Sequence, residues 1–236
     1  MTADGLTAEQ IVTFDLSEAK PRELNAVLHD PDITSATYRV INPGGRHSIA
    51  VGAVAPVSVD IDGHAGYYCA GMNQLAHVRV RGNAGTGVAE NMMSGTVVVE
   101  GDASQSAGAT ARGGLLVIEG SASARCGISL KGADIVVRGS IGHMSAFMAQ
   151  TGRIVVCGDV GEALGDSLYE ARIYVRGSVK SLGADCVEKP MREEHVAEVA
   201  ELLQRAGIDD QDTADFRRYG SARSLYHFNV DDAQAY

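Results

Sequence analysis

The sequence contains no tryptophan and few other aromatic residues. Aromatic side chains make up 5% of the 236 residues, although 45% of all residues are hydrophobic. Because aromatic rings supply much of the bulk of wide cores, a core built without them has to be thin and filled by Val, Ile, Leu and Ala. This composition favours the narrow interior of a solenoid over a wide sandwich.

Basic patches, long apolar runs and a secretion signal are also missing. The formal net charge is −10, and the 20 Lys and Arg residues are scattered. Neither nucleic acid nor an anionic membrane is therefore an expected partner. No stretch approaches the ~18 apolar residues of a membrane span, and residues 1–5 hold an early acid but no apolar run. We expect a cytoplasmic protein.

Glycine, by contrast, is abundant and periodic. A glycine recurs every 19 residues, at Gly63, Gly82, Gly101, Gly120, Gly139, Gly158 and Gly177. Such a period is the signature of a solenoid, in which each repeat forms one coil and buries its apolar face against its neighbours. The glycine column is expected at a corner, where a residue without a Cβ lets the chain turn or the coils approach closely.

The other positions of the repeat predict which side chains point inward. The residues two and four positions before each glycine are aliphatic in every repeat, as in Val137 and Ile135 before Gly139. Alternate residues of a strand share one face, so these two columns should form the core. A period of 19 without slippage favours a single-stranded right-handed parallel β-helix of about seven coils over a left-handed hexapeptide helix, which needs 18. The residue after each glycine is always polar, as expected on a solvated turn.

The two ends of the chain differ from the repeat. Residues 1–43 are expected to form an N-terminal cap, with a strand over 11–16 and a helix that begins at Pro21 and has Leu24, Val27 and Leu28 on one face. Residues 44–189 form the predicted β-helix, and 190–236 a C-terminal helix and tail. That second helix is predicted over 190–207, with Val196, Val199, Ala200 and Leu203 on its apolar face and Gly207 as the C-cap.

One outward-facing column is apolar and predicts a contact surface. The residues three positions before the glycines include five that are large and apolar in successive repeats. These are Val98, Val117, Val136, Val155 and Tyr174. A stripe of this length needs a cover. The sequence leaves two alternatives for this cover: the C-terminal helix of the same chain, or a partner protein.

No arrangement of residues indicates a catalytic, cofactor-binding or metal site in this chain. Residues 82–87 (GNAGTG) resemble a phosphate-binding loop, but they open no helix and their glycines fit the repeat. Asp60 and Asp62 could suggest calcium, but Arg79 and Arg81 stack beside them. The cysteines, Cys69, Cys126, Cys157 and Cys186, contain no CxxC pair. Cys69 and Cys126 occupy one column three coils apart, roughly 14 Å at ~4.8 Å per coil, so all four thiols should be free.

The repeats resemble a known family. Residues 82–108 (GNAGTGVAENMMSGTVVVEGDASQSAG) and 139–177 (GSIGHMSAFMAQTGRIVVCGDVGEALGDSLYEARIYVRG) are similar to the GXGXG domain, the C-terminal β-helix of the glutamate synthase large subunit. The literal G-x-G-x-G spacing is not kept, so the resemblance rests on the 19-residue register. With its length and the tail 216–223 (FRRYGSAR), the chain most resembles the separate β-helix subunits of N-methylglutamate synthases, over roughly 38–236.

The resemblance implies a function without catalytic residues in this chain. It implies a scaffold that joins a glutaminase-like amidotransferase subunit to an FMN-containing glutamate-synthase-like subunit in a hetero-oligomer. That assembly would convert methylamine and glutamate into N-methylglutamate and ammonia, with FMN on the partner. Two alternatives stay open: a component like the β-helix subunit of formylmethanofuran dehydrogenase, also in this family, or a free-standing structural solenoid.

Overall fold

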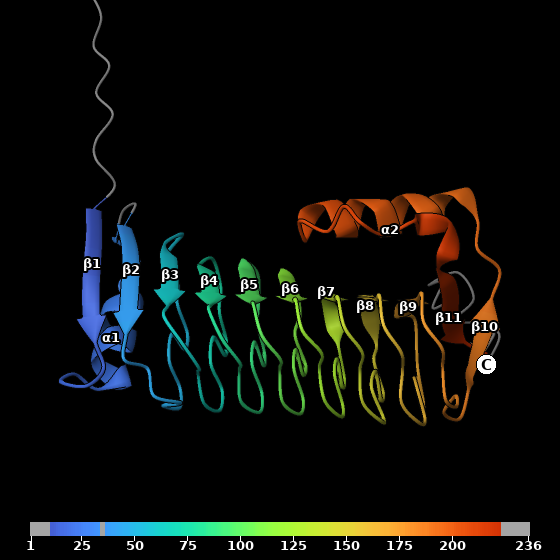
Figure 1. The fold of residues 1–236 in the computed structure, drawn as a ribbon, viewed down its shortest axis with the longest axis horizontal. Coiled ribbons are helices and arrows are strands. Elements are labelled where there is room, and N and C mark those ends of the chain that lie inside the picture. Colours follow the sequence, from blue (N-terminus) through green and yellow to red (C-terminus); the bar gives the residue numbers. More distant parts are fainter. Residues whose placement is uncertain (1–9, 34–35, 223–236) are drawn as a thin grey trace, which may run out of the picture.

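A single continuous sheet organises the molecule. The computed structural model describes residues 10–33 and 36–222, whose strands form one eleven-stranded sheet in the order β1-β2-β3-β4-β5-β6-β7-β8-β9-β11-β10 (Figure 1). The strands are β1 (Gln10–Asp15), β2 (Ala36–Ile41), β3 (Ser58–Ile61), β4 (His77–Val80), β5 (Thr96–Val99), β6 (Leu115–Ile118), β7 (Lys131–Val137), β8 (Thr151–Val156), β9 (Arg172–Val175), β10 (Cys186–Lys189) and β11 (Arg217–Ser221). The helices are α1 (Pro21–Leu28), α2 (Glu193–Arg205) and the 3-10 turn η1 (Thr213–Asp215).

Each repeat contributes one strand, and the coils stack in register. From β3 to β9 every strand pairs in parallel with the next at an offset of 19 residues, as in Ile118 with Val137 and Val137 with Val156. A second parallel ladder joins the residues two positions after the glycines, from Ala65 to Val179. The two aliphatic columns lie inside, with Ile135 and Val137 completely buried. The predicted parallel β-helix is confirmed.

The glycine column lets adjacent coils approach closely. The Gly158 N–H donates to the Gly139 carbonyl at 2.9 Å. A methyl group at Gly158 would lie only 2.7 Å from that carbonyl oxygen and 2.7 Å from Ser140 Oγ. Gly63 is the one member of the column with a left-handed φ. Close approach of the coils is therefore the reason for glycine in the column, and a special turn conformation is not.

The polar residue after each glycine has a structural role that the pattern did not reveal. Its side chain accepts a hydrogen bond from the backbone N–H of the same position in the next coil. The links run from His64 to Asn83, Asp102, Ser121, Ser140, Asp159 and Ser178, each side chain accepting from the N–H of the next residue named. We call this series the acceptor ladder. The glycines leave the room that it occupies, so the two columns depend on each other.

The acceptor ladder makes a specific prediction at Asp102, whose Oδ1 accepts from Ser121 N–H at 2.7 Å. Asp102→Ala should lower the free energy of unfolding by about 1 kcal/mol, because it leaves that N–H without its acceptor. Asp102→Asn, which keeps an acceptor oxygen, should stay near wild type, as should Glu119→Gln on the exposed surface. Urea unfolding curves measure the difference. Equal stability of Asp102→Ala and Glu119→Gln would contradict the role of the ladder.

The N-terminal segment extends the sheet as well as closing one end of the core. β1 and β2 pair in parallel with each other, and β2 pairs with β3, so the sheet runs on into the segment assigned to the cap. Helix α1 begins at Pro21, as predicted, and buries Leu24 and Leu28 completely. Val27, expected on the same face, is 37% exposed.

At the other end, the chain folds back on itself. β11 inserts antiparallel between β9 and β10, an arrangement that the repeat does not predict. Helix α2 lies along the outer face of the sheet and crosses its strands (Figure 1). The helix ends at its C-cap Ala206, and Gly207 follows with a left-handed φ of 71°, as the expected helix-terminating glycine.

The four cysteines are free and buried, as expected. Burial raises the pKa of the Cys69 and Cys126 thiols to about 12, and that of Cys157 and Cys186 to about 11. No helix within 10–33 and 36–222 has the length and apolar character needed to cross a membrane.

Candidate functional site

The apolar stripe on the outer face is covered by the chain's own C-terminal helix. Val136, Val155 and Tyr174 are completely buried, Val117 is 2% exposed and Val98 is 8% exposed. They form one cluster with Val199, Leu202 and Leu203 of α2, with Ile208 and with Phe216. Of the two covers that the sequence left open, the helix is the one present. The stripe is therefore not available as a docking face for a partner protein.

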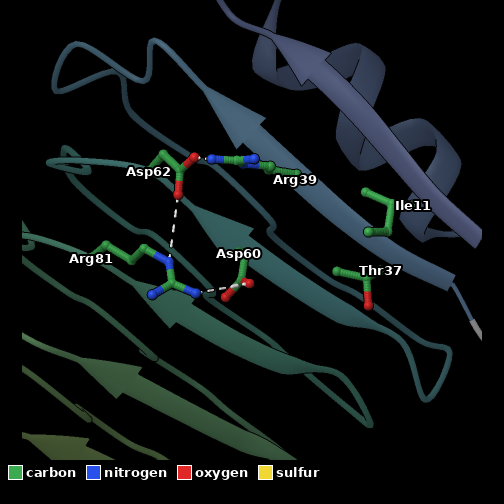
Figure 2. Close-up of a pocket in the computed structure, with 6 residues that line it drawn as sticks. All are labelled: Ile11, Thr37, Arg39, Asp60, Asp62 and Arg81. Carbon is green, nitrogen blue, oxygen red and sulfur yellow. Dashed lines mark hydrogen bonds and ion pairs between the residues drawn. The ribbon is translucent and has the colours of Figure 1, made fainter. Parts of the chain in front are cut away.

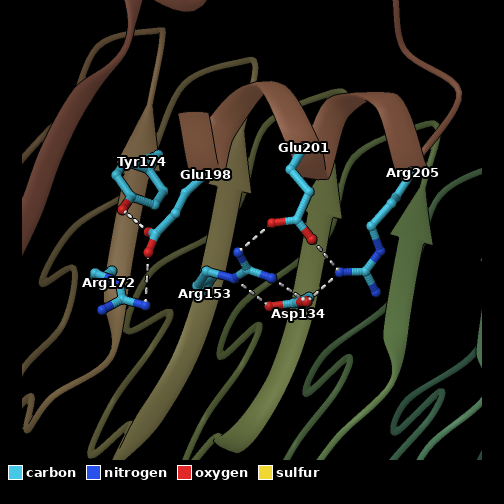
Figure 3. Close-up of polar contacts among 7 residues, drawn as sticks. All are labelled: Asp134, Arg153, Arg172, Tyr174, Glu198, Glu201 and Arg205. Carbon is cyan, nitrogen blue, oxygen red and sulfur yellow. Dashed lines mark hydrogen bonds and ion pairs between the residues drawn. The ribbon is translucent and has the colours of Figure 1, made fainter. Parts of the chain in front are cut away.

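Polar contacts fix α2 over this cluster (Figure 3). Asp134 on β7 accepts two hydrogen bonds from Arg153 on β8, each at 2.8 Å, and one from Arg205 of α2 at 2.8 Å. Arg153 also binds Glu201 at 2.9 Å. The hydrogen bonds to Asp134 raise the pKa of the Arg153 guanidinium above its usual range. A two-pronged arginine–carboxylate pair is geometrically specific, so this network fixes the position of α2 along the sheet.

A second polar group fixes the beginning of the helix. The Tyr174 hydroxyl donates to Glu198, which also forms an ion pair with Arg172 at 3.0 Å. Burial and this hydrogen bond raise the pKa of Tyr174. His195 is 7% exposed, and its Nδ1 accepts from the Arg192 N–H at 3.1 Å. Burial and the charge of Arg218 lower the pKa of His195.

No segment of the described residues covers the same outer face over β2–β4 (Figure 1). A 13-residue helix is about 20 Å long and spans about four strands at ~4.8 Å each, so α2 cannot cover the whole face. The uncovered part carries charged side chains of alternating sign. We call it the open half-face and define it by Thr37, Arg39, Asp60, Asp62, Arg79, Arg81 and Glu100.

A hollow of about 310 Å³ lies on the open half-face (Figure 2). Arg39 Nε contacts Asp62 Oδ2 at 2.7 Å, and Arg81 contacts Asp60 at 3.1 Å and Asp62 at 3.4 Å. Ile11 and Thr37 complete the lining. The pKa of Arg81 is raised, chiefly by its hydrogen bond to Asp60. In this hollow every charged side chain faces an opposite charge from a neighbouring coil.

The sequence candidates for ligand binding have other roles in the structure. The two carboxylates considered for calcium, Asp60 and Asp62, are paired with arginines. Over the described parts of the chain, no three His, Cys, Asp or Glu side chains gather where they could hold a metal ion. In the loop 82–87, a methyl group at Gly85 would lie 2.6 Å from the backbone of Gly66, so this glycine allows the close approach of two coils.

The ionic network was missed by the sequence interpretation, although a signal for it was present. Asp134, Arg153 and Arg172 occupy the same repeat position, five before the glycine, and are 19 residues apart. Opposite charges at that spacing lie side by side on adjacent strands, so the Asp134–Arg153 pair could have been read from the register. The contribution of Glu201 and Arg205 could not, because it depends on where α2 docks.

Fold and surface together define the class: a single-chain parallel β-helix whose outer face is half covered by its own helix and half open. No family model matches the chain. It is 62% identical over 225 residues to Protein GlxC of Rhizobium meliloti (strain 1021), covering 94% of this chain and 99% of that protein. The chain therefore belongs to the GlxC family.

A solved structure is similar as well. It is a chain of the formyltransferase/hydrolase complex (FhcABCD) from Methylorubrum extorquens in complex with methylofuran, with a TM-score of 0.48 and 25% identity. The match covers 64% of this chain and 67% of that chain. At this level of likeness, neither the partners nor the activity of that complex extends to the present chain.

Proposed function

We propose that this protein is the scaffold subunit of a glutamate-synthase-like complex, specifically an N-methylglutamate synthase. In that assembly it would join a glutaminase-like amidotransferase subunit to an FMN-containing synthase-like subunit. The complex would convert methylamine and glutamate into N-methylglutamate and ammonia. The similarity of the repeats to the GXGXG domain supports this choice of complex.

The observation that carries the scaffold role is the use of the polar side chains. The acceptor ladder binds backbone N–H groups of neighbouring coils. The Asp134 network binds α2. The carboxylates of the open half-face bind arginines of adjacent strands. All these groups are bonded to other parts of the same chain, whereas a catalytic site needs groups that are free to meet a substrate.

Within this proposal, the open half-face is the contact surface for the FMN-containing subunit. Arginine is enriched at the centres of protein interfaces, and Arg39 and Arg81 stand 58% and 45% exposed on this face. Each already has carboxylate neighbours that hold it in place, so little side-chain freedom remains to be lost on binding.

Co-expression of the tagged chain with the two proposed partner subunits tests the function. The complex should co-purify, carry flavin and form N-methylglutamate. Arg39→Ala with Arg81→Ala should weaken capture of the flavin-bearing subunit tenfold or more, because truncation of a hot-spot arginine at the centre of an interface costs about 2 kcal/mol or more. Lys180→Ala is the matched control, since Lys180 also forms an exposed ion pair, with Glu162, but on the last coil.

The melting temperature and the capture of the partners together distinguish the possible outcomes. Both variants should keep the melting temperature of the wild type, because exposed ion pairs contribute little to folding. Equal capture by the double variant and the control would remove the open half-face from the proposal. Failure of the wild-type chain to capture either partner would overturn the scaffold function and favour a free-standing solenoid.

A further inference from the structure

The two edges of the sheet are protected to very different degrees. β10, at the C-terminal edge, has four residues, includes the exposed Glu188 beside Lys189, and is followed by Pro190. Charges and proline are the usual devices that stop an edge strand from pairing with another chain. β1, at the other edge, reads QIVTFD and contains no lysine, arginine, proline or glycine. Its register with β2 is continuous over six residues, so no bulge protects it either.

The hydrogen-bond pattern shows which backbone N–H and C=O groups of β1 do not point to β2. Leu16 N–H donates to the Ile41 carbonyl of β2 at 3.0 Å. In a parallel pair the backbone N–H and C=O groups of successive residues point to opposite edges of the strand. Those of the even-numbered residues of β1 therefore point to β2, and those of the odd-numbered residues point away from the sheet. Of these, Asp15 already accepts a bond from the Ala19 N–H at 2.8 Å through its carbonyl. Among the described residues, Ile11 and Thr13 thus offer both an N–H and a C=O to a further strand.

The side chains of β1 also stop short of full burial. Val12 and Phe14 pack against the core yet are only partly buried, because no described coil lies beyond them. Ile11 points to the outer face and is 65% exposed. A strand added at this edge would bury apolar surface on both faces of the sheet.

We infer that β1 is a self-association site at which a second copy of this chain pairs antiparallel, related by a two-fold axis beside Val12. In this register Ile11 lies opposite Thr13 of the second copy, and Thr13 opposite its Ile11. Each of these two pairs exchanges two hydrogen bonds, so all the groups left free on β1 are satisfied. Val12 meets Val12 of the second copy on the core side, where it completes the burial of both.

Other ways of pairing fit less well. A register centred on Thr13 would place Ile11 opposite Asp15, whose carbonyl is already bonded to Ala19. Head-to-tail addition of β1 to β10 would meet the protected edge and would grow an open filament instead of a closed pair. This self-association stands independently of the proposed function.

Disulfide trapping in the full-length chain tests both the association and its register. Across the two-fold axis the Cα atoms of Val12 and its copy would be about 4.5 Å apart, within disulfide range. Val12→Cys should therefore form a covalent dimer under mild oxidation. Thr13→Cys should not, because Thr13 and its copy would be offset by two residues, roughly 8 Å apart from the strand spacing and rise. The four native cysteines are buried and should not interfere.

The second test is sedimentation of the protein without disulfide trapping. The wild type should sediment at twice the mass of one chain. Thr13→Pro, which removes an outward N–H and no bond to β2, should give a monomer with the same fold. Val187→Lys, a charge placed on the opposite edge strand, should remain dimeric. A monomeric wild type, a dimer that survives Thr13→Pro, or equal trapping by both cysteine variants would overturn the inference.

Discussion

Val137→Asp should lower the free energy of unfolding by about 4 kcal/mol or more, and the protein should fail to melt cooperatively near the wild-type temperature. Val137 is completely buried, between Ile118 of the preceding coil and Val156 of the next. A carboxylate there would lose its hydration, and the neighbouring side chains offer it no hydrogen-bond donor. Effects of this size are exceptional for single substitutions.

The measurement is thermal and urea unfolding, followed by circular dichroism. Val137→Thr, of nearly the same shape but with a hydroxyl group, should fall between the aspartate variant and the wild type. Glu119→Gln, on the exposed side of the neighbouring coil, should be silent. A Val137→Asp protein that melted within a degree or two of the wild type would show that this column does not form the interior.

Val117→Lys combined with Val136→Lys should destabilise the protein by several kcal/mol through the loss of α2 docking. Both valines lie under the helix, in the cluster that contains Val199 and Leu202. Two lysines cannot both reach solvent beneath a docked helix, so α2 should detach while the inward-facing core columns remain packed. Limited proteolysis should cleave the chain after residue 189 faster than in the wild type, and thermal unfolding should show a lower melting temperature.

The single substitution Val98→Lys provides a control in the same column. Val98 lies at the margin of the cover, and the next position in the column towards the N-terminus is already a cation, Arg79. Its effect should therefore be smaller than that of either buried valine. If the double lysine variant instead kept its stability and failed only to capture a partner, α2 would not be the true cover of the stripe.

Most of the fold could be predicted because the 19-residue repeat specifies equivalent positions in every coil. A core residue such as Ile154 is specified by six equivalent positions in other coils, so the strand, its inward face and its neighbours Ile135 and Ile173 follow together. The same register contained the Asp134–Arg153 pair. The acceptor ladder was visible only as a column of polar residues, because polarity alone does not distinguish a solvated turn from a hydrogen-bond acceptor.

The ends were less predictable because they depend on single tertiary contacts. The prediction placed Ala200 on the buried face of α2, but Ala200 is exposed and Leu202 and His195 are buried instead. Apolar residues occur on two sides of this helix, and contact with Tyr174 and the valine stripe selects one of them. β11 carries the sequence RRYGS, which has no strand pattern, and its pairing with β9 is set by the fold-back of the chain.

The location of the flavin tests the scaffold assignment most directly. The complex assembled from this chain and its two proposed partners would be separated into its component chains without denaturation, and the flavin of each fraction would be measured by absorbance. The scaffold assignment predicts that this chain is colourless and inactive with glutamate and methylamine, and that the flavin stays on the synthase-like partner. One flavin bound per isolated chain would contradict it.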